Sequence, residues 1–290
     1  MEDLEEETNG KFLTSLDIFN IVTYSFVLLF ASYMIVKYLI LEKKDITYLV
    51  AYYSLTVALA ISKICYFIIQ LTNKEGHLYM EYLNDLSSRV GPQFKVLIGL
   101  IQVAIMVELG IQVKMSARRM TQEEAEKKIK NLRCGFKLAS AFFSIVGIFD
   151  VYNNFYDNTY IVPDPKQWHR ILYYTIFPSE LVLISISLTI AYCYLSVNIK
   201  EHFAEQLQDE GKRIRAIFVF FSLSYISRAV VYILSQVFKK KYEEAVYDVL
   251  YFFWDVLPLS LIMSFHYKCF KAQEEYDNRQ SSESVEVPDP

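Results

Sequence analysis

Long apolar segments separated by short polar ones follow one another along the whole chain, and this pattern predicts the fold. Each apolar segment has about the length that a helix needs to cross the ~30 Å hydrocarbon core of a bilayer. Backbone N–H and C=O groups must be paired within lipid, so such segments are expected to be helices rather than open strands. The sequence therefore predicts an all-α membrane protein, a seven-transmembrane helix bundle. The predicted spans are Ile18–Leu41, Ile46–Leu71, Phe94–Val113, Phe136–Tyr152, Ile171–Val197, Ile214–Phe238 and Val246–Tyr267.

The distribution of charges supports this prediction more strongly than the overall composition does. Apolar residues make up 53% of the chain and charged residues 21%, close to the about 45–50% and about 25% of soluble domains. The charges, however, fall in short clusters between the apolar segments, which argues against a water-soluble enzyme. Fibrous and disulfide-rich secreted proteins are excluded as well, because the chain has only 8 Gly, 7 Pro and 4 Cys. A net charge of −4 is too small to indicate a nucleic-acid partner.

Three segments are expected along the chain. They are an acidic N-terminal tail over residues 1–17, the transmembrane domain over residues 18–267, and an acidic C-terminal tail over residues 268–290. The first segment is not expected to be a signal peptide, because it is acidic and the apolar run after it is too long. The C-terminal tail is polar and ends in proline, so it is expected to be disordered.

The positions of lysine and arginine predict the orientation in the membrane. With the N-terminus outside and the C-terminus inside, the inner side receives about twice as many of these residues as the outer side. Lys95, at the start of the third span, is assigned to the outer side in this scheme, and the run Lys239–Lys241 is the exception to it.

The loop after the third span is the most basic part of the predicted inner surface. It contains the sequence Thr121-Gln122-Glu123-Glu124, a capping-box pattern that predicts the start of a charged helix running to Arg133. Such a segment suits contact with a cytosolic protein or with anionic lipid. The alternative is a solvated helical extension of the third span. The candidate contact residues are Arg118, Arg119, Lys127 and Lys128.

Ionisable residues within the spans are the main functional candidates, because charges in the bilayer are costly and mark structural pairs or functional sites. Arg228 and Asp255 lie at equal distances from the centre of the loop that joins spans six and seven. Antiparallel neighbouring helices bring them to the same depth, where a guanidinium and a carboxylate can form a bidentate pair.

Two interpretations of this pair stay open. In the first, it is a structural ion pair that fixes how the two helices pack. In the second, it lines a polar cavity together with Lys63, Asp150 and Glu180, which fall toward the outer half of their own spans. Pro178 and Pro258 each remove a backbone hydrogen bond beside these carboxylates, so both helices are expected to kink there.

No catalytic motif is present, so the protein is not expected to be an enzyme. There is no G-x-S-x-G sequence, no glycine-rich phosphate loop and no pair of histidines with the spacing of a zinc site. No metal and no cofactor are predicted, and the seventh span has no lysine to which retinal could be attached. Cys269, directly after the last span, is a candidate for palmitoylation.

Several segments resemble one family, the plant tobamovirus multiplication proteins, whose shared region is the TOM/THH domain. Gly91-Pro92, Val107–Lys114 and Ala117-Arg118 resemble that family's Pro…Ala-Glu-Ile-Tyr…Gln-Ala-Arg stretch. The sequence Tyr225-Ile226-Ser227-Arg228 is similar to its Phe-Leu-Ile-Arg, and Tyr251–Leu261 is similar to its Tyr-Tyr-Leu-Leu-Val-Glu-Ile-Leu-Pro-Ser-Ser-Leu. The similarity covers about half of the chain, mainly spans three, six and seven.

The resemblance implies a non-enzymatic, receptor-like protein with seven helices and the orientation that the basic residues predict. Family members lie in vacuolar and other internal membranes, and plant members anchor viral replication proteins. The family's polar positions correspond to Glu108, Arg228, Asp255 and Pro258, with Asp255 in place of the family's Glu.

Three functions are compatible with these observations. The first is a receptor-like or adaptor protein that binds a ligand or a protein partner through its helix bundle and basic cytoplasmic loops. The second is a small-solute or proton-coupled transporter or channel that uses the buried charges. The third is a structural membrane subunit of a larger complex. In all three the lipid bilayer surrounds the protein, which is an integral, multi-pass protein of an internal membrane or the plasma membrane.

Overall fold

The structure, a computed structural model, describes residues 2–42, 48–72, 78–159, 167–203, 208–237, 244–268 and 271, and most of their side chains. Within these ranges the chain is helical except for the turn at 117–121. The helices are α1 (Glu2–Glu42), α2 (Tyr48–Thr72), α3 (Leu78–Ser116), α4 (Gln122–Thr159), α5 (Gln167–Phe203), α6 (Gln208–Val237) and α7 (Glu244–Tyr251). A π-helical segment, η1 (Phe252–Val256), follows α7, and α-helical turns continue over residues 257–268.

The seven predicted spans are confirmed. The described residues include seven helical segments that are long and apolar enough to cross a membrane, and they overlap the predicted ranges. These segments are Thr14–Leu39, Tyr48–Thr72, Val90–Ser116, Gln122–Phe149, Ile176–Ile199, Ile214–Leu234 and Val246–Lys268. The protein is therefore an all-helical, multi-pass membrane protein whose surroundings are a lipid bilayer.

The basic segment after the third span is helical, but it is not an extension of the third span. The capping box is present: the Glu124 N–H donates to Thr121 Oγ1 over 3.3 Å, and the Thr121 N–H donates to Glu124 Oε2 over 3.4 Å. The helix that starts there continues without a break into the fourth span. The charged helix therefore extends the fourth span and not the third, because the turn at 117–121 separates it from α3.

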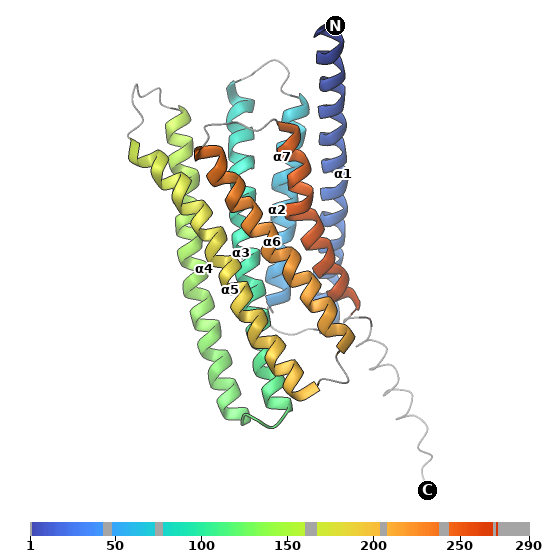
Figure 1. Cartoon of the computed structure of the whole chain (residues 1–290), viewed down its shortest axis with the longest axis vertical. Helices are drawn as coiled ribbons and strands as arrows, with labels where there is room; N and C mark the ends of the chain where they lie inside the picture. The colour runs from blue at the N-terminus through green and yellow to red at the C-terminus, as the bar shows by residue number, and fades with distance from the viewer. Residues whose placement is uncertain are drawn as a thin grey trace.

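The helices form an up-and-down bundle in which α3 has a central place. α3 packs against α2, α4 and α5, while α1 packs against α2 and α7, and α5 packs against α6. The start of α1 and the α3–α4 turn lie at opposite ends of the bundle (Figure 1). Because α1 begins at Glu2, it also includes the acidic N-terminal segment.

Burial is uneven among the helices, as expected when lipid surrounds the bundle. In α4 only Ala125 and Gly147 are buried among the described side chains, and its Leu138, Phe142 and Ile145 are more than 60% exposed. Such residues suit lipid, which is as apolar as they are. The core lies instead between α1, α2, α3, α5, α6 and the seventh helix. Its largest fully buried side chains include Trp254, Arg228, Tyr24, Tyr52, Tyr53, Tyr225 and Lys63.

Two predictions fall on residues that the structure does not describe. The C-terminal tail lies outside the described residues except for Lys268 and Lys271, and Cys269 lies outside them as well. The disorder of this tail and the palmitoylation of Cys269 therefore stay predictions.

Candidate functional site

The candidate site is built around Asp255, which the π-helical segment of the seventh helix carries into the core. In η1 the Leu257 N–H donates to the Phe252 carbonyl, five residues earlier, so this turn is wider than an α-helical turn. Pro258 follows directly and has no N–H to continue the α-helical pattern. Asp255 is completely buried, and the wide turn places its carboxylate among α1, α3 and α6.

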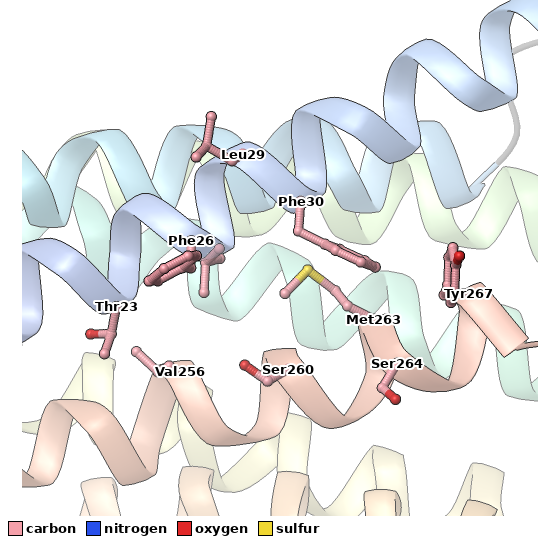
Figure 2. A pocket seen from close by; sticks show the side chains of 10 residues that line it. Thr23, Phe26, Leu29, Phe30, Val256, Ser260, Met263, Ser264 and Tyr267 are labelled. Carbon is pink, nitrogen blue, oxygen red and sulfur yellow. The ribbon is translucent and has the colours of Figure 1, made fainter.

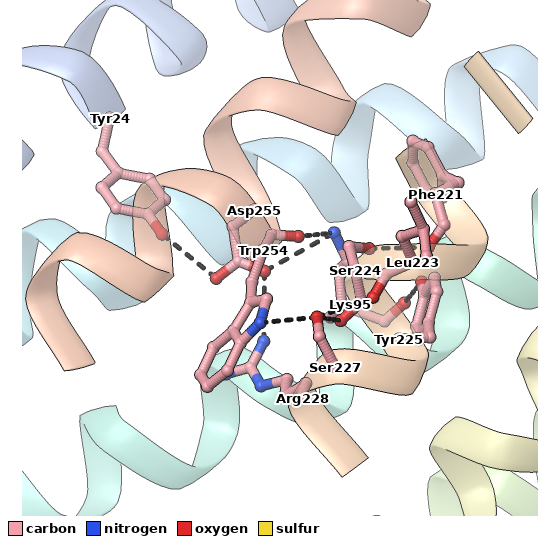
Figure 3. A network of polar contacts seen from close by, with 10 residues as sticks. All are labelled: Tyr24, Lys95, Phe221, Leu223, Ser224, Tyr225, Ser227, Arg228, Trp254 and Asp255. Atoms are coloured by element: carbon pink, nitrogen blue, oxygen red, sulfur yellow. Dashed lines mark hydrogen bonds and ion pairs between the residues drawn. The ribbon is translucent and has the colours of Figure 1, made fainter. Parts of the chain in front are cut away.

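Side chains from three helices bond to this one carboxylate or lie beside it as cations (Figure 3). Arg228 Nη1 from α6 donates to Asp255 Oδ1 over 3.1 Å. The Lys95 ammonium from α3 lies 3.5 Å from the same oxygen. The Tyr24 hydroxyl from α1 donates to the other oxygen, Oδ2, over 3.1 Å. We call these four residues the Asp255 network.

The Lys95 ammonium also bonds to the backbone of the seventh helix. It donates to the Trp254 carbonyl over 2.5 Å. In an α-helix that carbonyl would accept from the N–H of residue 258, and Pro258 has none. Lys95 therefore supplies the hydrogen bond that the proline removes, as an unpaired carbonyl within the bilayer would be costly.

A second set of hydrogen bonds holds the members of the network in place. The Tyr225 hydroxyl donates to the Lys95 carbonyl over 2.5 Å. The indole N–H of Trp254 donates to Ser227 Oγ over 2.9 Å. One turn of α6 carries Tyr225, Ser227 and Arg228. Through these side chains α6 is bonded both to α3 and to the seventh helix.

Lys63 of α2 joins the same region through an aromatic ring. Its side chain is fully buried, and its ammonium lies 3.4 Å from the centroid of the Tyr251 ring. The Arg228 guanidinium lies 5.6 Å from the centroid of that ring. A cation over an aromatic face is attracted by the ring quadrupole, so Tyr251 contacts two of the buried cations.

The predicted intramembrane charges are brought together only in part. Arg228, Asp255 and Lys63 meet in the core. The Arg228–Asp255 pair is present, but with one hydrogen bond rather than the expected bidentate geometry, because Tyr24 bonds to the second carboxylate oxygen. Glu180 is buried on α5 and is not among the residues that contact the Asp255 carboxylate.

Two further predicted positions lie elsewhere. Glu108 accepts a hydrogen bond from Arg133 of α4 over 3.3 Å, outside the Asp255 network. Asp150 belongs to α4, but its side chain lies outside the described part of the chain.

Sequence reasoning missed two members of the network. Lys95 is only 1% exposed, although its place at the start of the third span assigned it to the outer side. The helix in fact extends back to Leu78, and the membrane-spanning segment starts at Val90. Lys95 therefore lies inside the span, with Gly91-Pro92 before it. Tyr24 carries no signal in the sequence, because tyrosine is frequent throughout this chain.

The candidate contact residues of the basic segment are all exposed. Arg118 and Arg119 lie in the α3–α4 turn, and Lys127 and Lys128 lie on the first turns of α4. Arg118 has a φ of 54°, a left-handed conformation that sharpens this turn. These four side chains therefore lie at one end of the bundle, away from the Asp255 network.

A pocket of about 650 Å³ lies between α1 and the seventh helix, and its lining is largely apolar (Figure 2). Its hydroxyl-bearing residues are Thr23, Ser260, Ser264 and Tyr267. None of the residues of the Asp255 network lines it, although Val256 is the next residue after Asp255. This pocket is therefore distinct from the polar cavity that the buried charges suggested.

The sequence matches no model of a known protein family, and no curated protein matches it.

Proposed function

We propose that this chain is a receptor-like or adaptor membrane protein of the kind that its resemblance to the tobamovirus multiplication proteins implies. The observation that supports this most is that one carboxylate, Asp255, binds side chains from α1, α3 and α6. A signal can pass through a bundle only where a shared element responds to changes at two places. The Asp255 network is such an element, because a shift of any one helix changes the contacts of the other three.

The proposed partner surface is the basic end of the bundle formed by Arg118, Arg119, Lys127 and Lys128. All four are exposed, and the capping box fixes the start of the helix that carries the two lysines. In the proposed orientation, with the N-terminus outside, this end faces the cytosol, where basic residues concentrate in membrane proteins. An acidic surface on a cytosolic protein would complement it.

The test is purification of the native protein in mild detergent after crosslinking, with identification of the proteins that co-purify. We expect a cytosolic partner whose recovery falls at least about tenfold when Arg118 and Arg119 are both changed to Gln, as each lost charge contact to a carboxylate weakens binding. The matched control changes Lys212 and Arg215 to Gln. These are exposed basic residues near the start of α6, and the change should leave recovery unaltered. If recovery of the partner fell equally in the two double variants, a specific role of the α3–α4 turn would be contradicted.

A transporter is the second candidate, and one observation favours it. Lys63, Lys95, Arg228 and Asp255 are all at most 1% exposed and gather within the membrane-spanning part of the bundle. Buried ionisable groups of this kind mark ion and proton pathways. Solute or proton flux in reconstituted vesicles that disappears with Asp255→Asn, at equal amounts of folded protein, would favour transport over the receptor-like function.

A further inference from the structure

The buried cations around Tyr251 form ion pairs with a single carboxylate among the described residues. Three cations, Lys63, Lys95 and Arg228, surround the region, and each is at most 1% exposed. Their contacts include one carboxylate, that of Asp255. Its oxygens accept from Arg228, from Tyr24 and, at longer range, from Lys95. Asp255 therefore compensates Arg228 and Lys95 but does not bond to Lys63.

Several N–H donors of these cations have no acceptor in the part of the chain that the structure describes. Among the described residues, Lys63 Nζ and the Nε and Nη2 atoms of Arg228 have no hydrogen-bond partner, although all three are buried. Asp248, about two turns before Asp255 on the same helix, is buried and attracts Lys63 through space, but it forms no hydrogen bond with it. Buried donors without acceptors are costly, and more so when they carry charge.

The unpaired donors belong to two cations that share one ring. Tyr251 lies 3.4 Å from the Lys63 ammonium and 5.6 Å from the Arg228 guanidinium, measured to its centroid. The ring attracts both cations, but it is neutral and does not offset their mutual repulsion. A negative charge within reach of both sets of donors would do so.

We propose that Lys63 and Arg228 bind a small inorganic anion of the halide class within the bundle, between α2, α6 and the seventh helix. A halide is acceptor-only and accepts hydrogen bonds from an ammonium and a guanidinium at the same time. The anion must be small because its donors are fully buried, and the 650 Å³ pocket opens elsewhere, between α1 and the seventh helix. Gly91 of α3 contributes to the site, because a Cβ there would lie 3.3 Å from Lys63 Cε and crowd the lysine stem.

The first experiment measures thermal unfolding of the full-length protein, purified in detergent, in sodium chloride and in sodium gluconate at equal ionic strength. We expect a saturable rise of roughly 5 °C in chloride once its concentration is about 100 times the dissociation constant. Bromide should act like chloride. Equal unfolding temperatures in chloride and gluconate would overturn the proposal, since water or a neutral lysine would then satisfy the site.

The variant Lys63→Met tests the position of the site. It removes the charge but keeps the length of the stem, so the variant should be more stable than the wild type in gluconate and should not respond to chloride. The matched control is Lys114→Met, because Lys114 also lies over a tyrosine ring, 4.8 Å from the centroid of Tyr194. This control should keep the full response to chloride. A chloride response retained by Lys63→Met would overturn the assignment to this lysine.

A binding measurement on the wild type does not depend on the folding of any variant. Equilibrium binding of radioactive chloride to the purified protein should saturate at about one ion per chain, with gluconate unable to compete and bromide competing. No saturable binding would contradict the proposal. Neither result depends on whether the protein acts as a receptor, because the site is defined by its own donors.

Discussion

At the scale of single residues, the structure shows how side chains from three helices surround one carboxylate within a bundle that crosses a membrane. Asp255 has no access to solvent, yet it accepts from Arg228 and Tyr24 and lies beside Lys95. A buried ion pair contributes little net stability compared with an apolar replacement, whereas removal of one partner leaves a costly unpaired charge. The network is therefore more sensitive to single changes than its contribution to stability suggests.

The first prediction concerns Asp255→Asn. The amide keeps the shape and an acceptor oxygen but removes the negative charge, so Lys95 and Arg228 lose the group that compensates them. We expect the free energy of unfolding to fall by about 3–5 kcal/mol, measured by SDS titration of the protein in mild detergent. Glu123→Gln, which removes an exposed carboxylate on α4, should change it by less than about 0.5 kcal/mol. Similar stabilities of the two variants would contradict a central role for Asp255.

A graded effect is expected at Tyr24. Tyr24→Phe removes one hydrogen bond to Asp255 Oδ2 and leaves the two cations in place. The same titration should show a loss of about 1–2 kcal/mol, smaller than that of Asp255→Asn. The matched variant Tyr33→Phe changes a tyrosine of α1 that is 49% exposed and should have little effect. A loss for Tyr24→Phe as large as that for Asp255→Asn would mean that the hydroxyl does more than donate one bond.

At the scale of elements, the seventh helix depends on a side chain from another helix to complete its backbone hydrogen bonds. The π-helical segment and Pro258 interrupt the α-helical pattern at the depth of the Asp255 network. Lys95 of α3 donates to the Trp254 carbonyl, and Tyr225 of α6 donates to the carbonyl of Lys95. Three helices are thus joined through backbone groups as well as through side chains.

A double-mutant cycle tests this dependence. Lys95→Met should destabilise the protein by about 3 kcal/mol, because it removes the bond to the Trp254 carbonyl and the contact with Asp255. Pro258→Ala restores an N–H that can donate to that carbonyl, so it should recover part of this loss in the Lys95→Met background. A coupling of about 1 kcal/mol is expected from unfolding titrations of the four proteins. Pro178→Ala, on α5, serves as the control and should show no coupling, while additive effects of Lys95→Met and Pro258→Ala would contradict the interpretation.

Helix packing at Gly99 gives a separate prediction for α3. A Cβ at this position would lie 2.5 Å from Ile184 Cγ2 and 2.6 Å from the Tyr225 hydroxyl. Gly99→Ala should therefore push α3 away from α5 and α6 and lower the free energy of unfolding by about 1–3 kcal/mol. Gly135→Ala is the matched control, because a Cβ there meets no described atom within 4 Å, and it should stabilise α4 by about 0.5–1 kcal/mol. Equal effects of the two changes would show that the close approach at Gly99 is not maintained.

At the scale of the whole molecule, the packing divides the bundle into a polar centre and a lipid-facing periphery. The charged core joins α1, α2, α3, α6 and the seventh helix, whereas α4 packs mainly on α3, contacts α2 through Phe136 and Tyr48, and presents apolar side chains outward. The turn that carries Arg118 and Arg119 lies at the opposite end from the start of α1 (Figure 1). The charge distribution predicts which end faces the cytosol, and this orientation can be measured.

The prediction is that the α3–α4 turn faces the cytosol. In a background without the four native cysteines, Arg119→Cys should react with a membrane-impermeant thiol reagent in sealed microsomes, whose cytosolic face is outward. Thr72→Cys, at the exposed end of α2, should react only after permeabilisation, because it lies at the other end of the bundle. The reverse pattern of labelling would show that the N-terminus is inside.

Much of the fold could be predicted from the sequence, because the spacing of apolar residues reflects the thickness of the bilayer. The spans follow from this spacing, and the contact of Arg228 with Asp255 follows from the equal depth of the two residues on antiparallel neighbours. The start of α4 could be predicted from Thr121 and Glu124, because their side chains bond to backbone groups only three residues away. The role of Lys95 could not be predicted, because it depends on where α3 begins and on a carbonyl 159 residues away along the chain.

The helical membrane fold, with charges buried in its spans, can be read from hydropathy and helical rise alone, because both are properties of consecutive residues and do not depend on neighbouring helices. Which of these charges meet depends on how the helices pack. Asp255 is shared among Arg228, Lys95 and Tyr24, and Lys63 lies over Tyr251 instead. The physical reason is that the depth of a residue is set by its place in its own helix, whereas its partners are set by the rotation and packing of other helices.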